Sequence, residues 1–366
     1  MILQFGAGNF LRGFADLFVH ELARDHGRSI GPVVVVQSTD HHRADALNHV
    51  QGRYHVAIQG FRAGRVIDET VDVRSISRAL HAGSQWDEVL TTARVPELVA
   101  ILSNTTEAGF VLDDEDATRS ARAPVSFPAK LLAVLLERGS IGLPGPWIIP
   151  CELIENNGES LKALVLAQAE RWEVGDGLLD WIANECRWVN SLVDRIVPGP
   201  PKAHPLLGVD PLLISAEPFA LWAVESQDPA FPFAGHPALV MAEDIRSYTL
   251  RKVRILNGAH SALVCRAAGT GLTTVRDCLE DATVGPWLEG LLNEEIVPVL
   301  EGRCHDPAGF AREVLDRFRN PFLEHRLSAI ALNHGAKVAV RLEPTLREYR
   351  ERFGAEPERL GAILRI

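Results

Sequence analysis

Apolar and polar positions follow a recognisable order over the first 40 residues. Residues 1–5 (MILQF) form a short apolar run, and residues 6–13 (GAGNFLRG) form a glycine-rich turn. Residues 14–27 then place apolar side chains at helical spacing, and residues 32–40 (PVVVVQSTD) are rich in β-branched residues, as in a fully buried parallel strand. This order predicts a strand, a turn, a helix and a second strand, which together make a βαβ unit.

The pattern keeps producing strands as far as Tyr248 and then becomes helical. Alternation of apolar and polar residues at 54–58 and 64–75 predicts a half-exposed hairpin. Further extended segments are expected within 97–110, 145–158, 188–197 and 236–245, with helices between residue 159 and the third of them. We therefore predict an α/β fold. A Rossmann-type, mostly parallel sheet domain with an inserted hairpin would span residues 1–248, and an all-helical C-terminal domain would span 249–366, with the active site in the cleft between them.

Composition and charge narrow the class of protein. The chain has 366 residues, of which 46% are hydrophobic, and its longest apolar runs are much shorter than a membrane span. We therefore expect a cytoplasmic protein with no membrane partner. The net charge of −11 argues against nucleic acid as a partner, and five cysteines without CxxC spacing predict reduced thiols and no metal site. A small molecule is the expected partner.

The glycine-rich turn predicts a dinucleotide site. Gly6 would permit the tight turn and Gly8 the close approach of a pyrophosphate, which the N-terminus of the next helix would face. Asn9 and Phe10 in the same turn are further candidates for cofactor binding, and Arg12 would either pair with phosphate or be exposed. Asp40, at the end of the second strand, would bind the adenosine ribose and select NAD. NADP stays open, because Ser38, Thr39 and Arg43 could instead hold a 2′-phosphate.

A polar stripe interrupts the apolar segment 251–264 (RKVRILNGAHSALV). On a helix with 100° per residue, Asn257 lies about 140° and His260 about 80° from Lys252, so the three share one arc. Lys252 would be the general acid and base, since burial and nearby positive charge can lower the pKa of a lysine. Asn257, with Asn157 from the segment IENNG, would donate to a developing alkoxide as an oxyanion hole, and His260 would orient Lys252 or bind a substrate hydroxyl.

Two other interpretations of this stripe stay open. In the first, Lys252 extends its charged end to solvent at the start of a helix while Asn257 and His260 cap internal carbonyls. Alternatively, Tyr248 and Lys252 reproduce the YxxxK spacing of short-chain dehydrogenases, although the glycine turn lacks the TGxxxGxG form of that family.

Six blocks of the sequence, spread over most of the chain, occur in the order seen in the polyol-specific long-chain dehydrogenases, the mannitol dehydrogenase family. The blocks are GAGNFLRG, SNTTEAGF, CELIENNG, NSLVDRIVP, EPFALW and KVRILNGAH. Within the family, the opening LQFGAGNFLRGF, the block CELIENNGESLK and the late segment LNHGAKVAVRLEPTL most resemble the tagaturonate reductases. The resemblance implies a Rossmann domain followed by a helical domain, and metal-independent catalysis by Lys252 with Asn257 and His260 beside it.

The resemblance also suggests roles for residues that spacing alone does not single out. Glu107 resembles an acid near the nicotinamide that could relay protons, and Thr105 in the same block becomes a candidate for cofactor binding. Asp194 and Lys337 resemble substrate-binding residues, and Lys337 would suit a sugar carboxylate. Two positions depart from the family pattern: an arginine expected eight residues before Lys337 is Ala329, and an asparagine of mannitol-type members is Leu153 here.

The implied activity is the reversible, NAD-dependent interconversion of a secondary alcohol and a ketone on an open-chain sugar acid or polyol. D-Tagaturonate and D-altronate are the first substrate pair to expect. Fructuronate reduction and mannitol–fructose chemistry are the enzymatic alternatives. A non-catalytic protein that senses nucleotides with the same fold is an alternative of another class, for which Lys252 would be dispensable.

Overall fold

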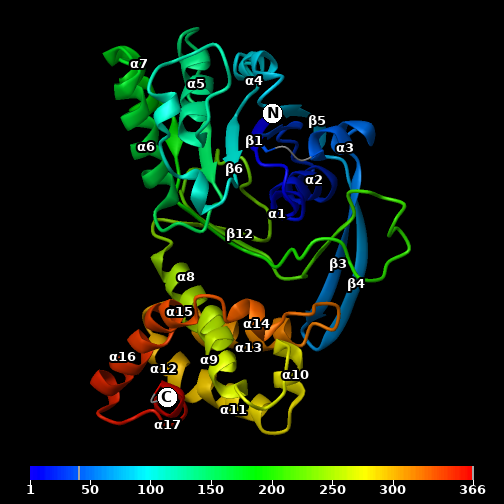
Figure 1. The fold of residues 1–366 in the computed structure, drawn as a ribbon, viewed down its shortest axis with the longest axis vertical. Helices are drawn as coiled ribbons and strands as arrows, with labels where there is room; N and C mark the ends of the chain where they lie inside the picture. Colours follow the sequence, from blue (N-terminus) through cyan, green and yellow to red (C-terminus); the bar gives the residue numbers. More distant parts are fainter. Residues whose placement is uncertain (40–41, 365–366) are drawn as a thin grey trace. The chain divides into compact units, whose positions relative to one another are not determined.

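The computed structural model describes residues 1–39 and 42–364, and it divides the chain into two compact units (Figure 1). We call the first the sheet unit; it comprises Met1–Ala57, Thr70–Ala216 and Ala220–Ile245. We call the second the helical unit; it comprises Ile58–Glu69, Glu217–Phe219 and Arg246–Ile366. No helix among the described residues is long and apolar enough to span a bilayer.

A six-stranded sheet forms the centre of the sheet unit, and every pairing within it is parallel. In spatial order its strands are β5 (Ile76–His81), β2 (Val33–Gln37), β1 (Ile2–Phe5), β6 (Ala100–Ser103), β7 (Trp147–Pro150) and β8 (Arg187–Trp188). β1 lies in the middle and pairs with both β2 and β6, so the strand order reverses beside it. The predicted Rossmann-type sheet is thereby confirmed, and its ligand site is expected at the carboxyl ends of β1, β2 and β6.

Seven helices belong to the described part of the sheet unit. They are α1 (Asn9–Arg12), α2 (Ala15–Asp25), α3 (Arg43–His49), α4 (Trp86–Ala93), α5 (Phe127–Gly139), α6 (Asn157–Arg171) and α7 (Asp176–Asp180). α4, α5 and α6 cover one face of the sheet (Figure 1). On that face, Phe5 of β1 and Val36 of β2 belong to the same apolar cluster as the side chains of α5, which is almost wholly buried. Because the sheet is buried on both faces, the sequences of these strands are continuous apolar runs.

Two three-stranded sheets complete this part of the fold. The predicted hairpin is confirmed as β3 (Tyr54–Arg62) and β4 (Arg65–Val73), and β3 also neighbours β10 (Ile214–Ala216). The other sheet pairs β11 (Leu221–Glu225) antiparallel with β9 (Ser191–Asp194) and parallel with β12 (Leu239–Ala242). β10 and β11 were not predicted, because strands this short show too few alternating positions.

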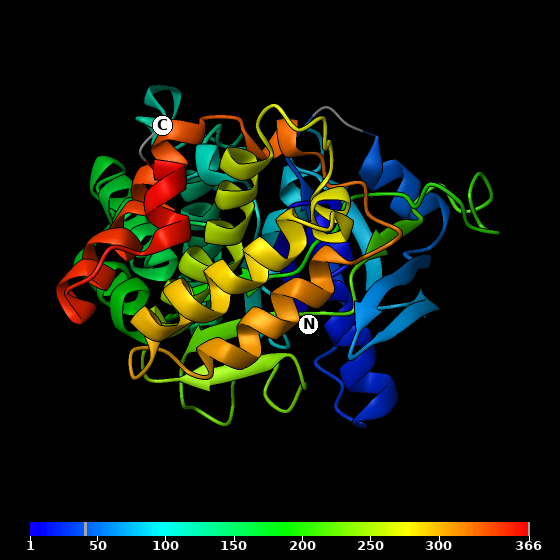
Figure 2. The same ribbon diagram turned by 90° about the horizontal axis from the view of Figure 1, so that it is seen from below.

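The helical unit contains ten α-helices among the described residues. They are α8 (Arg246–Arg251), α9 (Gly258–Ala267), α10 (Val275–Glu280), α11 (Val284–Gly290), α12 (Val297–Leu300), α13 (Pro307–Phe318), α14 (Leu327–Ile330), α15 (His334–Arg341), α16 (Glu343–Phe353) and α17 (Glu358–Leu364). Figure 2 shows α11 and α12 joined by a π-helical turn into one long helix that runs beside α13. Buried apolar side chains of α9, such as Leu263, form a single core with those of its neighbours. The helical second part of the fold is therefore confirmed.

The two compact units depart from the sequence-based boundary at 248 in the hairpin, in Glu217–Phe219 and in a boundary at Arg246. The boundary at residue 248 put the whole hairpin in the first domain, whereas its tip, Ile58–Glu69, belongs to the helical unit. Asn320 donates from Nδ2 to the carbonyl of Gln59 at 3.1 Å, and Asp316 accepts from the backbone N–H of Ala63 at 3.0 Å. These partners lie more than 250 positions apart in the sequence, so the alternating pattern of the hairpin could not predict the contacts.

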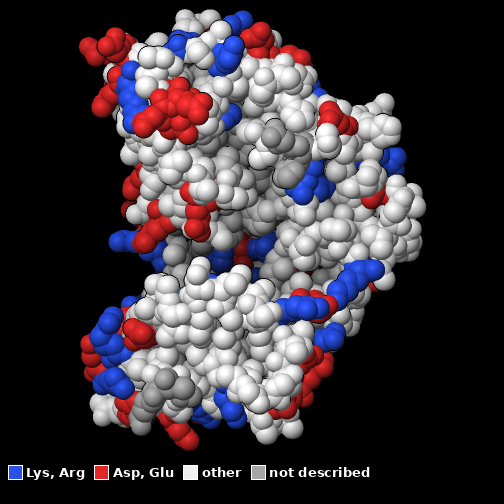
Figure 3. Space-filling view, in the orientation of Figure 1, with Lys and Arg blue, Asp and Glu red and all other residues white. Residues whose placement is uncertain are grey.

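Charged side chains of both signs lie on the face of the molecule drawn in Figure 3. On the face in Figure 3, Lys and Arg are interspersed with Asp and Glu. Many of them form exposed ion pairs, such as Arg53 with Asp72 at 2.8 Å and Arg350 with Glu356 at 2.6 Å. Exposed pairs of this kind contribute little to stability, so the fold depends mainly on its buried apolar side chains.

Candidate active site and nucleotide cavity

A cavity of about 470 Å³ opens at the carboxyl ends of β1, β2 and β6. Its walls come from Gly6–Gly8 after β1, from 37–39 after β2, from 104–106 after β6, and from the first turn of α5. Parallel α/β sheets bind nucleotides at this position, where the strand order reverses. The cavity therefore has the location and the size for part of a dinucleotide.

The glycines of the turn serve different purposes. Gly6 has a φ of +127°, and a Cβ there would lie 3.1 Å from the carbonyl oxygen of Asn104. Gly8 faces more open space, because the nearest atom to an added Cβ would be Nη1 of Arg43 at 3.9 Å. At Gly13 a Cβ would lie 3.0 Å from Val197, so this glycine allows close packing and not ligand approach. Gly6 and Gly8 thus leave a cradle in which backbone can approach a phosphate.

Asn9 and Phe10 begin α1 and do not line the cavity. The Oδ1 of Asn9 accepts from Arg12, and the ring of Phe10 stacks on Phe14 at a centroid distance of 5.0 Å. Both side chains are therefore used within the sheet unit, and a contact of Asn9 or Phe10 with cofactor stays a prediction.

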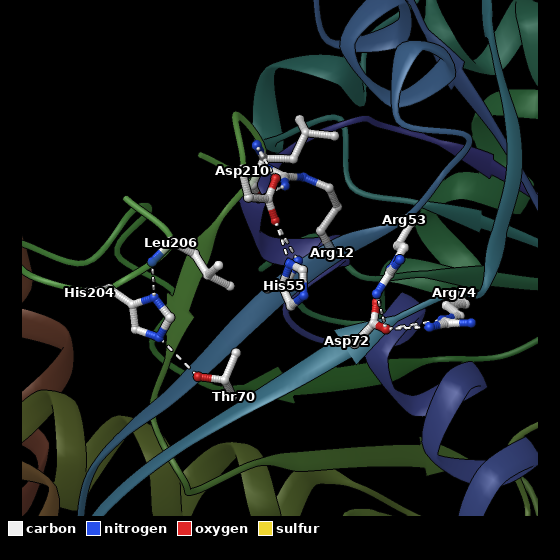
Figure 4. A network of polar contacts seen from close by, with 10 residues as sticks. Arg12, Arg53, His55, Thr70, Asp72, Arg74, His204, Leu206 and Asp210 are labelled. Atoms are coloured by element: carbon white, nitrogen blue, oxygen red, sulfur yellow. Dashed lines mark hydrogen bonds and ion pairs between the residues drawn. The ribbon is translucent and has the colours of Figure 1, made fainter. Parts of the chain in front are cut away.

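The structure contradicts the prediction that Arg12 binds the cofactor. Arg12 is 3% exposed, donates from Nη1 to the carbonyl of Leu212 at 2.5 Å, and lies 5.4 Å above the ring of Tyr54. Burial lowers the pKa of its guanidinium. Figure 4 shows it beside Asp210, which accepts from the ring and the backbone N–H of His55. Arg12 thus fastens the loop around Leu212 to the rest of the sheet unit and is neither exposed nor available to phosphate.

The choice between NAD and NADP depends on the loop after β2. Asp40 lies outside the described residues, while Ser38, Thr39 and Arg43 all line the cavity. Gln37 shapes this loop, because its side chain donates to the carbonyl of Thr39 and accepts from the backbone N–H of Ala44, both at 2.7 Å. Ribose hydroxyls or a 2′-phosphate would both find partners there.

Thr105 lines the cavity, but its N–H and O–H groups both donate to a buried carboxylate, so its predicted contact with cofactor stays a prediction. The backbone N–H of Thr105 donates to Oε1 of Glu152 at 2.8 Å and its hydroxyl to the same oxygen at 3.1 Å. Ser103 donates to the other oxygen at 3.0 Å. Glu152 is 2% exposed, and burial raises the pKa of its carboxyl. Glu152, which the sequence analysis missed, thus holds the loop after β6 against the end of β7.

Lys130 is a second residue that the sequence analysis missed. It lies on α5, is 6% exposed, lines the cavity, and donates from Nζ to the carbonyl of Val125 at 2.6 Å. Burial lowers the pKa of its ammonium group. An ammonium with further N–H donors beside this cavity would suit a phosphate. The apolar run after it, LLAVLL, gives no local indication that Lys130 lies beside a ligand site.

Glu107 begins a single 3-10 turn, Glu107–Gly109, and its side chain is exposed. It does not line the cavity, although its neighbours Thr106 and Ala108 do. Asp194 is 4% exposed at the end of β9, opposite Leu221 of β11. The roles suggested for Glu107 and Asp194 stay predictions.

The structure contradicts the role of Asn157 as an oxyanion donor. Its Nδ2 lies within 3.2 Å of the carbonyls of Pro150, Glu152 and Ser191, and its Oδ1 accepts from the backbone N–H of Ser191 at 2.8 Å. The residue is 0% exposed. Its amide therefore has no N–H left for a substrate, and it fastens β7 to the segment that begins β9.

The predicted polar stripe begins in a π-helical turn. Lys252–Asn257 is π-helical between α8 and α9, and Lys252 and Asn257 are both half-buried. Because a π-helix links residues five apart, these two positions come closer to one face than the α-helical angle of about 140° allows. Such turns are frequent at functional sites. The α-helical spacing assumed for the stripe was therefore wrong, and the joint action of Lys252, Asn257 and His260 stays a prediction.

His260 is the most enclosed member of the stripe. It is 8% exposed, and its ring packs on Phe318 at 4.5 Å and on His325 at 4.6 Å between centroids. Its Nε2 has no hydrogen-bond partner among the described residues. Burial, and then the positive groups His325, Arg317, Arg341 and Lys337, hold the pKa of His260 well below its usual range. The imidazole is therefore neutral at physiological pH.

Lys337 lies on α15 and donates from Nζ to the carbonyl of Ile330 at 2.9 Å. It is half-buried and belongs, like Lys252, Asn257 and His260, to the helical unit. Gly6, Gly8 and Thr105 in turn come together around the cavity of the sheet unit. Among the described residues no group of three or more His, Cys, Asp or Glu side chains has the arrangement of a metal site.

Comparisons with known proteins place both parts of the chain in one family. The mannitol dehydrogenase Rossmann domain matches residues 1–233, and the mannitol dehydrogenase C-terminal domain matches residues 244–364. An altronate oxidoreductase of Bacillus subtilis (strain 168) is 41% identical over 375 residues, which cover 98% of this chain and 77% of that protein. An altronate oxidoreductase of Pectobacterium carotovorum subsp. carotovorum (strain PC1) is 38% identical, and the alignment covers 99% of this chain and 77% of that protein.

Solved structures share the fold. D-sorbitol dehydrogenase in substrate-free form is similar with a TM-score of 0.82 at 22% identity, covering 96% of this chain and 76% of that one. Pseudomonas fluorescens mannitol 2-dehydrogenase, in a ternary complex with NAD and D-mannitol, has a TM-score of 0.78 at 22% identity. The match covers 99% of this chain and 77% of that one. Since both domain models match in order and relatives align along nearly the whole length, this chain belongs to the mannitol dehydrogenase family.

Proposed function

We propose that this chain is a reversible, NAD(H)-dependent oxidoreductase that interconverts D-tagaturonate and D-altronate, a ketone and a secondary alcohol on an open-chain sugar acid. The observation that carries the proposal is the 41% identity to an altronate oxidoreductase over 98% of this chain. The nucleotide cavity and the polar stripe on the helix that starts at Lys252 support it.

In this proposal the cavity of the sheet unit holds the dinucleotide. Gly6 and Gly8 would let the backbone approach the pyrophosphate, and Lys130 would contribute positive charge. We favour NAD over NADP, with the loop at Ser38 and Thr39 binding ribose hydroxyls. When bound, the nicotinamide ring would deliver a hydride to the ketone carbon or take one from the alcohol.

The residues of the helical unit would handle the proton and the substrate oxygen. Lys252 would donate a proton from Nζ to the ketone oxygen during reduction and accept it during oxidation. Asn257 would donate from its amide to the same oxygen, and it takes this role alone because the amide of Asn157 is already bonded to backbone. The neutral imidazole of His260 cannot supply the proton, so it would hold Lys252 or a substrate hydroxyl by hydrogen bonding. No metal ion is invoked.

Two residues complete the proposal. Lys337 would bind the carboxylate of the sugar acid, and Asp194 would contact its hydroxyls. The five free cysteines fit the proposed cytoplasmic location, where thiols stay reduced.

The proposal is tested by incubating the purified chain with NADH or NADPH and a panel of substrates, and following loss of reduced cofactor by absorbance. The panel is D-tagaturonate, D-fructuronate, D-fructose and D-tagatose. We expect the highest kcat/KM with D-tagaturonate and NADH. A preference for fructuronate or fructose would reassign the substrate within the family. Binding of NADH without turnover of any substrate would instead favour a nucleotide sensor.

A further inference from the structure

In the part of the chain that the structure describes, two positive side chains near His260 have no negative partner. Arg317 also lies near this ring, but it is neutralised, because it donates to both oxygens of the buried Glu217 at 2.8 and 3.0 Å. Lys337 and Arg341, by contrast, have only neutral hydrogen-bond partners among the described residues: the carbonyl of Ile330 and the hydroxyl of Ser261. Among the described residues, the helical unit thus contains uncompensated positive charge beside a buried imidazole whose Nε2 has no hydrogen-bond partner.

The packing of α15 on α9 brings Arg341 to this place. His334, at the start of α15, contacts Sγ of Cys265 through Nε2 at 3.2 Å, and Arg341, at its end, lies with Nη1 3.3 Å from Oγ of Ser261. The two helices therefore run alongside each other, and Arg341 reaches α9 at the residue next to His260. Lys337 lies one helical turn before Arg341, on the same side of α15.

Arg341 is held only loosely in this position. The one side-chain hydrogen bond that Arg341 makes with the described residues, at 3.3 Å, is long for a charged donor, and the guanidinium offers five N–H groups in all. The residue is half-buried, and burial lowers the pKa of its guanidinium. A partly desolvated arginine with free donors is suited to bind a carboxylate through two parallel hydrogen bonds.

We propose that Arg341, together with Lys337, binds the carboxylate of the substrate and so selects sugar acids over neutral sugars. This inference rests on the proposed function, since it names the group that distinguishes the proposed substrate from an uncharged polyol. Arg341 would act on affinity and not on the chemical step. A carboxylate remote from the reacting carbon makes the same contact in the ground state and in the transition state, so its loss raises KM and leaves kcat nearly unchanged.

The test measures binding first, because binding can be read without turnover. Isothermal titration of the full chain, with NADH present so that D-altronate cannot be oxidised, compares D-altronate with D-altritol, in which a hydroxymethyl group replaces the carboxylate. We expect the wild type to prefer D-altronate and Arg341→Ala to lose roughly 100-fold in affinity for it, with little change for D-altritol. Arg341→Lys should keep part of the preference. Arg347→Ala, which removes an exposed arginine of the next helix, is the matched control and should change neither value.

Three results would overturn the proposal: equal affinity of the wild type for the two ligands, an unchanged preference in Arg341→Ala, or an equal loss for both ligands in that variant. Turnover of D-tagaturonate is measured separately. If the wild type fails to reduce it but prefers D-altronate to D-altritol through Arg341, the proposed reaction is wrong and the carboxylate site stands. If turnover occurs but the preference survives in Arg341→Ala, only the carboxylate site is wrong.

Discussion

Glu152 accepts hydrogen bonds from both the backbone N–H and the hydroxyl of Thr105, so that a buried carboxylate after β7 fixes the loop after β6. Thr105 and its neighbours Asn104 and Thr106 form one wall of the nucleotide cavity. The shape of that wall is therefore set by a residue that does not line the cavity.

Replacing Glu152 should weaken cofactor binding. Glu152→Ala removes the acceptor of three hydrogen bonds and leaves buried donors unpaired, so we expect the Kd for NADH to rise by roughly tenfold. Glu155→Ala, at an exposed glutamate three residues later, is the control. Titration of NADH fluorescence measures both. An unchanged Kd in Glu152→Ala would show that the loop keeps its shape without this carboxylate.

Lys252 should control the chemical step without affecting the cofactor. Lys252→Ala should lower kcat for D-tagaturonate by about 1,000-fold, the usual effect of losing a general acid. Its Kd for NADH should not change, since the cavity belongs to the sheet unit. Lys252→Arg is the sharper variant, because a guanidinium keeps the charge but does not release a proton at neutral pH. Turnover that survives in Lys252→Arg would refute acid–base catalysis by this residue.

Asn157 should matter for stability and not for catalysis. Asn157→Ala leaves the backbone groups of Ser191 and of Pro150 and Glu152 without their partner, and we expect it to lower the free energy of unfolding by about 3 kcal/mol. Urea denaturation measures this loss. Asn184→Ala, at an exposed asparagine with one hydrogen bond, should cost far less. If Asn157→Ala instead keeps its stability and loses kcat, the oxyanion role would have to be restored.

Asp16 should make stability depend on pH. It is 0% exposed on α2, and burial raises the pKa of its carboxyl from 3.8 to about 7, although Gln4 donates a hydrogen bond to it. At a pH between these two pKa values, Asp16 has lost its proton in the unfolded chain but keeps it in the folded chain. The contribution of Asp16 to stability is therefore highest below pH 4 and falls as the pH rises to about 7.

The variant Asp16→Asn isolates this effect, because it keeps the shape of the side chain and removes its titration. The free energy of unfolding of Asp16→Asn, relative to wild type, should increase by about 3 kcal/mol between about pH 5 and about pH 8. Urea denaturation at the two pH values gives the difference. A difference that does not change with pH would mean that Asp16 ionises as easily in the folded chain as in the unfolded one.

The sequence by itself determined the order and type of the main elements. Apolar runs such as VVVVQ became buried parallel strands, because burial on both faces demands continuous hydrophobicity. The turn at Gly6 and Gly8 was readable because its chemistry is local: a positive φ and an open backbone belong to the residues themselves. The stripe Lys252, Asn257 and His260 could be proposed for the same reason, since helical periodicity depends only on neighbouring positions, but its α-helical spacing was wrong because Lys252–Asn257 is π-helical.

Only the tertiary structure decided which polar groups are available for chemistry. Arg12 and Asn157 were both predicted to bind ligands. In the structure Arg12 donates to a carbonyl 200 positions away, and Asn157 exchanges hydrogen bonds with Ser191, 34 positions away. Lys130 and Glu152 were not predicted as site residues. Lys130 precedes an apolar run and Glu152 lies in an acidic loop, and neither local pattern indicates that the side chain is buried beside the nucleotide cavity. Hydrogen bonding capacity is used up by whatever group the fold brings within about 3 Å, and no local pattern in the sequence encodes that group.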